Sequence, residues 1–379
     1  MLDALFALLV MLVPKLQLGS APVPEAPASF CFKIFRFPPQ SRAFIAIPFP
    51  SWSLGTSLDE FKQFIPSVEI EMLSDIRKYL LSSLQFGAFP NDYKNENDGY
   101  KKSKVVIMGV PFDGTATYQT GTKLGPNAIL NASVNVEPYD DELGDAYTVG
   151  MFTAGTLAVE EIHTDPKNVI DATYRVSSMI VKDNKFLVTL GGEHSISQGM
   201  VKAYKEKYKK LSVLQLDAHL DFMDHFGGTR YSHASVSRRM VEDLKCKVTS
   251  FGVRVVSKEE SDFVKKNKDS VSVFYAKDIH DNDDWHGDAL ETLEDHVYVT
   301  LDVDGLDVSI MPATGTPVPG GLGWYRTIDF LRKVYQNKVV VGLDVVELKP
   351  NPGNEAPNFL TASLVYKNIG FYKKYTLSR

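Results

Sequence analysis

Three short clusters of acidic and histidine residues each follow a run of apolar residues, and this arrangement constrains the fold more than any other feature of the chain. The apolar runs are residues 186–190, 211–216 and 297–301. Each run is short, nearly continuous and contains β-branched residues, which is typical of strands buried on both faces of a parallel sheet. The sequence therefore predicts that the clusters lie at the carboxyl ends of the strands, the edge where open α/β sheets bind ligands.

The clusters contain the residue types that bind divalent metal ions. They are the segments 191–195 (GGEHS), 217–221 (DAHLD) and 302–307 (DVDGLD). Because successive side chains of an extended segment point to opposite faces, we expect the alternate positions 217, 219 and 221 to share one side, and 302 and 304 to do the same. The six predicted metal ligands are His194, Asp217, His219, Asp221, Asp302 and Asp304.

The charge of these residues predicts two metal ions rather than one. Four carboxylates crowded together would repel one another, and burying them unpaired would cost several kcal/mol each. Six ligands for two ions require shared carboxylates, which would hold the ions about 3.5–4 Å apart as in two-metal hydrolases. Oxygen-rich ligands with some imidazole favour manganese, with nickel as the main alternative and iron or cobalt as further competitors. A cysteine-rich zinc site is excluded because the chain has two cysteines.

Other apolar runs alternate with helical patterns along the chain. Strand-like runs lie at 105–109, 247–252, 271–275 and 338–346, and helical patterns lie at 197–208 and 327–335. This alternation predicts a doubly wound, mostly parallel α/β sheet. We expect an N-terminal extension, residues 1–58, followed by one enzyme domain, residues 59–379, because single α/β domains of roughly 300 residues occur and no linker interrupts the later part.

The clusters resemble the metal-binding motifs of the ureohydrolase family, which includes arginase and agmatinase. The resemblance covers residues 104–372 and includes the long segment 302–321. The segments 109–115 (GVPFDGT) and 231–235 (YSHAS) are similar to the agmatinase-like branch rather than to arginase itself. The resemblance implies an arginase-like three-layer αβα fold, a homo-trimer or homo-hexamer, two divalent metal ions and hydrolysis of a small guanidino substrate.

The resemblance also implies how the ligands are divided between the two ions. Carried over residue by residue, His194, Asp217, Asp221 and Asp302 would hold one ion. The other ion would be held by Asp217, His219, Asp302 and Asp304, so that Asp217 and Asp302 are shared.

Two further residues are expected to act on the substrate. In the implied reaction, water activated by the two ions attacks the guanidinium carbon, and urea and an amine are released. His233 is the predicted proton shuttle, and the metal ligand Asp221 is also expected to be catalytic. His225, in the same loop as His233, is a competing choice for the shuttle that only the resemblance sets aside. Glu347, at the end of a predicted strand, is expected to bind the guanidinium in fork geometry.

The sequence does not decide the chemical nature of the substrate tail. Segment 314–316, which includes Thr316, is expected to form the pocket floor, and residues 113–123 its rim. The loop 222–235 should line the outer pocket and offers both acids and bases, Asp224, His225 and Arg230. Agmatine, which would give putrescine and urea, is favoured by the resemblance; guanidinobutyrate, guanidine and formimidoylglutamate remain alternatives. A different class of function, a metal-binding regulatory relative without turnover, is also retained.

One residue departs from the family pattern. Val308 stands where the family usually has proline, which we expect to change the stiffness of the loop rather than metal binding, because proline mainly fixes φ. The preceding Asp307 is not expected to be a ligand. Its carboxylate should accept backbone N–H groups in the loop.

Composition limits the partners and the location of the protein. The net charge is −6, which argues against a nucleic-acid surface because phosphate binding needs clustered lysine and arginine.

The apolar run 4–13 is too short to span a bilayer, which needs about 20 residues. The acid-poor N-terminus is compatible with a mitochondrial or plastid transit segment, or with an extension that carries no address. Cys31 and Cys246 give no disulfide framework, so a reducing compartment, cytoplasmic or organellar, is expected.

Overall fold

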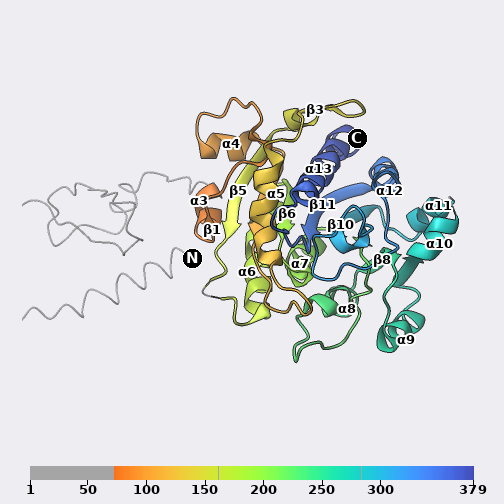
Figure 1. Cartoon of the computed structure of the whole chain (residues 1–379). Coiled ribbons are helices and arrows are strands. Elements are labelled where there is room, and N and C mark those ends of the chain that lie inside the picture. The colour runs from red at the N-terminus through yellow and green to blue at the C-terminus, as the bar shows by residue number, and fades with distance from the viewer. Residues whose placement is uncertain (1–71, 161, 283) are drawn as a thin grey trace, which may run out of the picture. The chain divides into compact units, whose positions relative to one another are not determined.

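A nine-stranded sheet forms the middle layer of the protein (Figure 1). The structure is a computed structural model that describes residues 72–160, 162–282 and 284–379. The predicted extension, residues 1–58, and its boundary with the enzyme domain lie outside the described residues. The strand order is β1-β5-β2-β6-β11-β10-β7-β8-β9, and every neighbouring pair is parallel except β1 with β5.

The strands of this sheet agree closely with the apolar runs of the sequence. Their bounds are β1 Leu80–Leu81, β2 Val105–Val110, β5 Met151–Leu157, β6 Phe186–Gly191, β7 Leu211–Leu216, β8 Lys247–Val253, β9 Val271–Tyr275, β10 His296–Asp302 and β11 Val339–Val346. A separate antiparallel pair is formed by β3 (Tyr139–Asp140) and β4 (Gly144–Asp145). The predicted mostly parallel α/β sheet is therefore confirmed.

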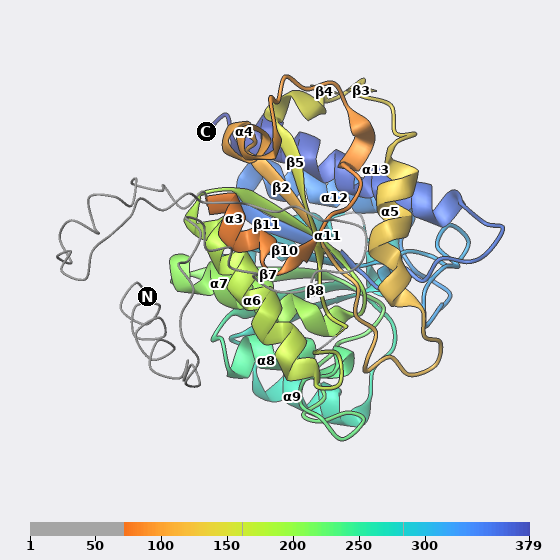
Figure 2. The ribbon, with the colours of Figure 1, turned by 90° about the vertical axis from the view of Figure 1, so that its left-hand side faces the viewer.

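Helices cover both faces of the sheet, which gives the expected three layers (Figure 2). One face packs against α5 (Gly125–Ser133), α11 (Trp285–Glu291), α12 (Trp324–Asn337) and α13 (Ala356–Phe371). The other face packs against α6 (Pro166–Lys182), α7 (Ser197–Lys207) and α8 (Val236–Glu242). The remaining helices are α3 (Met72–Arg77), α4 (Glu96–Lys102), α9 (Lys258–Lys266) and α10 (Ala276–Asp281).

Several single turns connect these elements. The turns are the 3₁₀ segments η2 (Phe86–Ala88), η3 (Thr122–Leu124), η4 (Ala146–Val149), η5 (His194–Ile196), η6 (His233–Ser235) and η7 (Val303–Gly305), and the π-helical η8 (Tyr372–Thr376). Three of them, η5, η6 and η7, begin at or next to residues of the predicted site.

The apolar strands explain the layers. In β2, Val105 and Ile107 belong to one buried cluster, whereas Val106 and Met108 belong to the other. Side chains of a strand alternate between faces, so a strand that is apolar at every position must be covered on both sides. The core therefore lies in two slabs, one on each face of the sheet. Within the described residues, no helix is both long and apolar enough to cross a membrane.

Candidate metal centre

The predicted site lies at the carboxyl ends of four adjacent strands, β6, β11, β10 and β7, in the middle of the sheet. His194 follows β6 by three residues, Asp217 directly follows β7, and Asp302 is the last residue of β10. Glu347 directly follows β11. Because the strands are parallel and neighbouring, residues from four distant parts of the sequence reach one place.

Unusual backbone conformations bring these side chains inward. A Cβ on Gly192 would lie 1.9 Å from the carbonyl oxygen of Phe112, so only glycine allows the turn after β6. Asp221 and Glu347 both adopt the left-handed region, with φ of 57° and 65°. Positive φ at non-glycine residues costs free energy and is concentrated at functional sites. Both carboxylates reach the site because of these turns.

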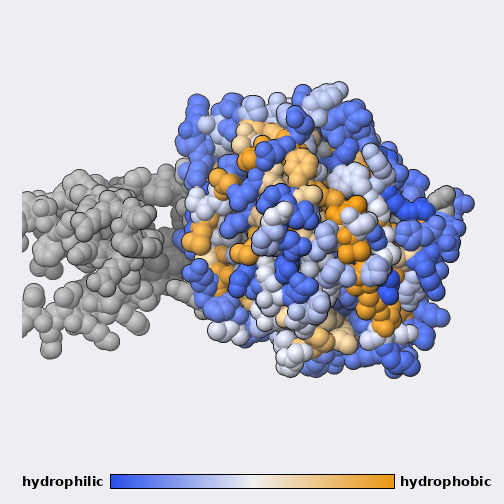
Figure 3. Space-filling model, in the orientation of Figure 1, coloured by the Kyte–Doolittle hydropathy of each residue, from blue (hydrophilic) through white to orange (hydrophobic). Residues whose placement is uncertain are grey.

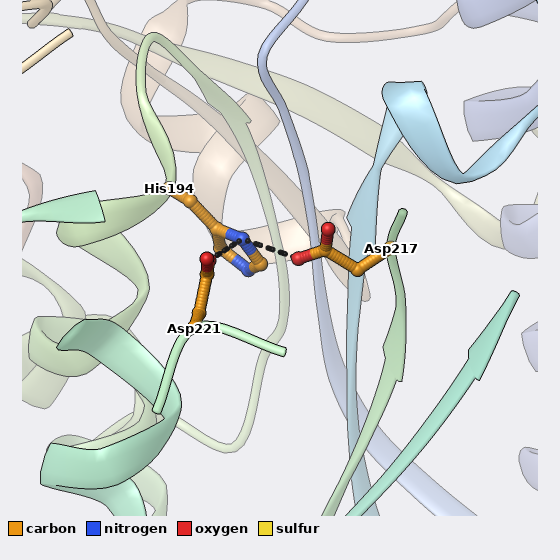
Figure 4. A group of neighbouring side chains, drawn as sticks. All are labelled: His194, Asp217 and Asp221. Carbon is orange, nitrogen blue, oxygen red and sulfur yellow. Dashed lines mark ion pairs between the residues drawn. The ribbon is translucent and has the colours of Figure 1, made fainter. Parts of the chain in front are cut away.

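One group of side chains surrounds the imidazole of His194 (Figure 4). Its Nδ1 lies 3.2 Å from Asp217 Oδ2 and 3.1 Å from Asp221 Oδ2. Asp302 Oδ2 lies 3.4 Å from the same nitrogen. All four side chains are buried. The arrangement places one imidazole nitrogen and three carboxylate oxygens around a common point.

A second group shares Asp217 with the first. It consists of Asp217, His219 and Asp304, and His219 Nδ1 lies 3.5 Å from Asp217 Oδ1 and 3.0 Å from Asp304 Oδ2. Asp302 stands beside this group, with its Oδ1 accepting a hydrogen bond from the backbone N–H of Asp304 at 2.8 Å. The structure thus brings the six predicted ligands together: five of them form two groups that share Asp217, and Asp302 lies beside both groups.

The reason given for this convergence, strand alternation, was wrong in part. β7 ends at Leu216, so Asp217, His219 and Asp221 lie on an irregular segment with a left-handed residue rather than on an extended strand. Asp304 likewise lies in the 3₁₀ turn η7 and not on β10. The irregular segments that follow the strands bring the side chains together. Strand alternation does not, because most of these residues lie outside the strands.

The electrostatics of the site are those of crowded like charges. Burial and the neighbouring Asp217 raise the pKa of Asp221 to about 7. Burial, Asp304 and Asp217 together raise the pKa of Asp302 well above its usual range. Burial lowers the pKa of His194, but the surrounding aspartates outweigh it and raise that pKa well above 6.5. Bound cations would relieve the repulsion and hold these groups as carboxylates and neutral imidazoles.

The hydrogen bonds of His194 leave one ring nitrogen free for a cation. Thr300 Oγ1 donates to Asp344 Oδ1 at 2.6 Å, so it accepts from His194 Nε2 at 2.9 Å. The other nitrogen, Nδ1, is buried and makes no hydrogen bond to any described residue. Carboxylate-linked histidines of this kind are typical metal ligands, because the second nitrogen sets the tautomer. The donor set therefore fits a divalent metal ion.

A cavity of about 330 Å³ opens onto this centre. His219, Asp221, Asp302 and Asp304 form its inner wall, together with Glu347. The outer wall is largely apolar. It is formed by Ala116, Thr117, Tyr118, Gln119, Met223, Phe226, Val255 and Val256.

The predicted substrate residues are only partly placed at this cavity. His233, Glu347, Gly315 and Thr316 line it, and the hydroxyl of Thr316 donates to Asp304 Oδ2 at 3.0 Å. Of the expected rim, residues 116–119 line the cavity. The ends of that segment, Asp113 and Lys123, line a different cavity.

The charged residues of the loop 222–235 turn away from the cavity. His225 has a side chain 62% exposed and pairs with Asp224. Asp224 also binds Arg239 at 2.8 Å, and Arg230 binds Asp243 at 3.0 Å. None of these three residues lines the cavity. The choice between an acid and a base in this loop, which the sequence left open, therefore does not decide the substrate tail.

Comparison with known proteins supports the geometry. The pattern of the Arginase family matches residues 103–370. The chain belongs to the arginase family. Within the family, it is 36% identical over 279 residues to an N(1)-aminopropylagmatine ureohydrolase of Synechocystis, which covers 72% of this chain and 90% of that protein. It is 34% identical over 273 residues to an agmatinase of Pyrococcus horikoshii, which covers 71% of this chain and 92% of that protein.

A solved family member has the same fold. The agmatine ureohydrolase of Thermoplasma volcanium superimposes with a TM-score of 0.68 at 33% identity, covering 81% of this chain and 99% of that chain. The expected membership of the agmatinase-like branch of the ureohydrolases is confirmed. The protein is accordingly a hydrolase of guanidino compounds. Metal dependence follows from the family, and the two ligand groups provide for it.

This chain also contains residues near the metal centre that were not predicted from the sequence. Asp344 lies in the middle of β11, fully buried, and Thr300 lies in the middle of β10. An aspartate inside an otherwise apolar run, VVVGLDVV, was a visible signal that a polar partner must lie beside it. Glu193 and Thr115 lie in the predicted segments 191–195 and 113–123, but their contact with each other was not predicted, because it joins residues 78 positions apart in the sequence.

Asp307 has the structural role that the sequence suggested. Its Oδ1 accepts the backbone N–H of Ser309 at 3.0 Å, and its Oδ2 accepts the N–H groups of Gly320 and Gly321 at 2.9 and 3.0 Å. These bonds, with those from the Ser309 hydroxyl and backbone largest, lower the pKa of Asp307 to about 2. The carboxylate thus closes the loop 307–321 without the proline that the family usually has at position 308.

Proposed function

We propose that this hydrolase acts on agmatine or a closely related guanidino compound with a cationic tail. The observation that carries this proposal is the charge of the cavity lining. Among the described residues, no lysine or arginine lines the cavity. A dicationic substrate would gain favourable electrostatic interactions there, whereas a carboxylate tail would be repelled. The lining acids that are not proposed metal ligands are Glu260 and Glu347, and the charges of Asp221, Asp302 and Asp304 would be offset by the bound ions.

Glu260 supports the preference for a cationic tail. Glu260 lines the cavity together with Val255 and Val256, and its side chain is buried. Its two carboxylate oxygens accept the backbone N–H groups of Phe222 at 3.1 Å and Ser257 at 3.0 Å. No lysine or arginine of the described chain pairs with it, so its negative charge is available to the outer cavity.

Two divalent ions, manganese first and nickel as the alternative, would be held by the ligands already described. His194, Asp217, Asp221 and Asp302 would bind one ion, and Asp217, His219, Asp302 and Asp304 the other. The two groups that share Asp217 support this division. When bound, the ions would supply an activated water molecule close to the substrate.

Glu347 and His233 would orient the substrate and move the proton. Glu347 Oε1 accepts the backbone N–H of His194 at 2.7 Å, which fixes the carboxylate in the inner cavity to pair with guanidinium N–H groups. Hydrolysis transfers the oxygen of water to the guanidinium carbon and both of its protons to the leaving nitrogen. His233, whose pKa is lowered to about 4 chiefly by burial, is neutral at pH 7 and accepts a proton before delivering it.

The other substrates fit this cavity less well. Guanidinobutyrate and formimidoylglutamate would place a carboxylate against Glu260 or the apolar wall, without a cationic side chain to pair with it. Guanidine has no tail and would leave the outer cavity unused. A regulatory relative without turnover would have no need for His233 and Glu347 in the cavity beside the ligands, yet both are present.

Several expectations from the sequence accompany this proposal. We propose a homo-trimer or homo-hexamer. Leu81, Leu84 and Leu124 support it, because each is 55–56% exposed and apolar surface of this kind marks association sites. Figure 3 shows apolar residues gathered in patches on the face that carries α5. We keep a cytoplasmic or organellar location as a proposal. We also propose that residues 1–58 are dispensable for catalysis, because none of the predicted ligands or pocket residues lies among them.

Urea release from a panel of guanidino compounds tests the substrate. With manganese or nickel added, we expect kcat/KM to be highest for agmatine or aminopropylagmatine. Guanidinobutyrate and arginine should be slower by at least about a hundredfold, because a charge mismatch inside a cavity costs several kcal/mol. Faster turnover of guanidinobutyrate would contradict the cationic tail. Absence of urea from every compound would favour the regulatory relative.

A further inference from the structure

Glu193 is a buried acid next to the metal centre that does not belong to either ligand group. Its side chain is fully buried. The hydroxyls of Ser195 and Thr115 both donate to its Oε1 at 2.5 Å, and the backbone N–H of Thr115 donates to its Oε2 at 2.7 Å. Three donors thus bind the two carboxylate oxygens, and two of these donors belong to Thr115.

Thr115 connects this carboxylate to His233. Its Oγ1 lies 3.1 Å from His233 Nδ1 and also 3.1 Å from the backbone nitrogen of His233. A hydroxyl has one proton, and the shortest contact, to Glu193, takes it. Toward His233 the oxygen can therefore only accept. The backbone N–H is one donor, and the other must be the ring nitrogen Nδ1, carrying its proton.

The other nitrogen of the ring is left for the substrate. His233 lines the cavity, and no described residue forms a hydrogen bond with its Nε2. The ring is held on one side by Phe226, whose ring centroid is 5.5 Å away in an edge-to-face arrangement. With Nδ1 bonded to Thr115, Nε2 is the nitrogen that carries the free lone pair.

We propose that Thr115 and Glu193 are positioning residues that hold His233 in the tautomer protonated at Nδ1, so that Nε2 accepts a proton during hydrolysis. The kinetic consequence rests on the proposed function. The attacking water loses two protons, one when it binds the guanidinium carbon and one when urea forms, and the leaving nitrogen gains both. Nε2 takes each proton in turn, forming an N–H bond, and passes it to that nitrogen, which returns the ring to its neutral form each time. Thr115 keeps its proton throughout. Glu193 accepts the hydrogen bond of that hydroxyl and so keeps the hydroxyl oxygen directed as an acceptor toward His233.

Two substitutions at one position test the kinetic part. Thr115→Val keeps the shape of the side chain and removes the hydroxyl, whereas Thr115→Ser keeps the hydroxyl. We expect Thr115→Val to lower kcat by about tenfold to a hundredfold with little change in KM, because only the proton transfer is impaired. Thr115→Ser should stay within about threefold of the unsubstituted protein. In a His233→Ala background, Thr115→Val should cause no further loss, since the two residues act as a unit. Equal losses in Val and Ser variants, or an additive double variant, would overturn the proposal.

A measurement on the metal-free protein tests the tautomer without any turnover. Nitrogen-15 NMR of histidine-labelled protein reports which ring nitrogen carries the proton, and the His233 signals are those missing from His233→Ala. We expect the Nδ1-protonated form in the unsubstituted protein and in Thr115→Ser. The form protonated at Nε2 should appear in Thr115→Val. An Nε2-protonated ring in the unsubstituted protein would mean that Thr115 donates to the imidazole, and the proposal would be wrong.

The two readouts separate this inference from the proposed function. If the unsubstituted protein releases no urea from any guanidino compound, the proposed function fails, but the NMR experiment still decides the tautomer. If urea is released and Thr115→Val turns over at the full rate, the proposed function stands and the positioning role is excluded.

Discussion

Replacing Asp217 with asparagine should abolish turnover and reduce bound metal from two ions per chain to less than one. Asp217 is the residue common to both ligand groups, with one oxygen 3.2 Å from His194 Nδ1 and the other 3.5 Å from His219 Nδ1. An amide keeps the shape but offers one neutral oxygen, so neither ion would keep its shared ligand. A loss of several kcal/mol of stabilisation corresponds to a fall in kcat of about a thousandfold or more.

A matched aspartate provides the control for this experiment. Asp224 lies in the following loop, is 44% exposed and pairs with arginines outside the cavity. Asp224→Asn should keep two ions and nearly full activity. Metal analysis and circular dichroism of both variants separate loss of metal from loss of fold. Two ions and normal turnover in Asp217→Asn would exclude a shared ligand at this position.

Replacing His233 with alanine should lower kcat by about a hundredfold to ten-thousandfold, the usual contribution of general acid–base catalysis. Metal content should be unchanged, because His233 belongs to neither ligand group. The cavity left by the ring should admit small imidazoles, which we expect to restore part of the rate. The measurement is steady-state kinetics of urea release with and without added imidazole.

His225→Ala is the matched control for His233. The side chain of His225 is 62% exposed and does not line the cavity. Its removal should change kcat by less than about twofold, as for most surface substitutions. If His225→Ala were the more damaging change, the assignment of the proton shuttle to His233 would have to be abandoned.

The sheet and the meeting of the ligands could be predicted because both follow from local patterns. Nearly continuous apolar runs such as residues 297–301 are expected to be buried on two faces, and the acids directly after them to lie at the sheet edge. The paths of the turns could not be predicted in the same way. The left-handed conformation of Asp221 and the 3₁₀ turn at Asp304 depend on tertiary contacts, which strand alternation alone does not predict.

The residues around the outer cavity could not be predicted from the sequence. Asp224 and Arg230 were equal candidates for contact with the substrate tail, because nothing local reveals that each already has an ion-pair partner. Glu260 lies in the first turn of α9, where it forms a capping box with Ser257. Nothing in the local sequence indicates that it also lines the cavity. The bonds from Thr115 to Glu193 span 78 residues, and such contacts appear only when the chain is folded.

Anomalous X-ray diffraction from crystals grown with manganese tests the central claim, that these six side chains hold two metal ions, most directly. We predict two peaks at the carboxyl edge of the sheet. One should lie among His194, Asp217 and Asp221, and the other among Asp217, His219 and Asp304. A single peak, or manganese bound away from Asp217, would contradict a two-metal centre in this protein.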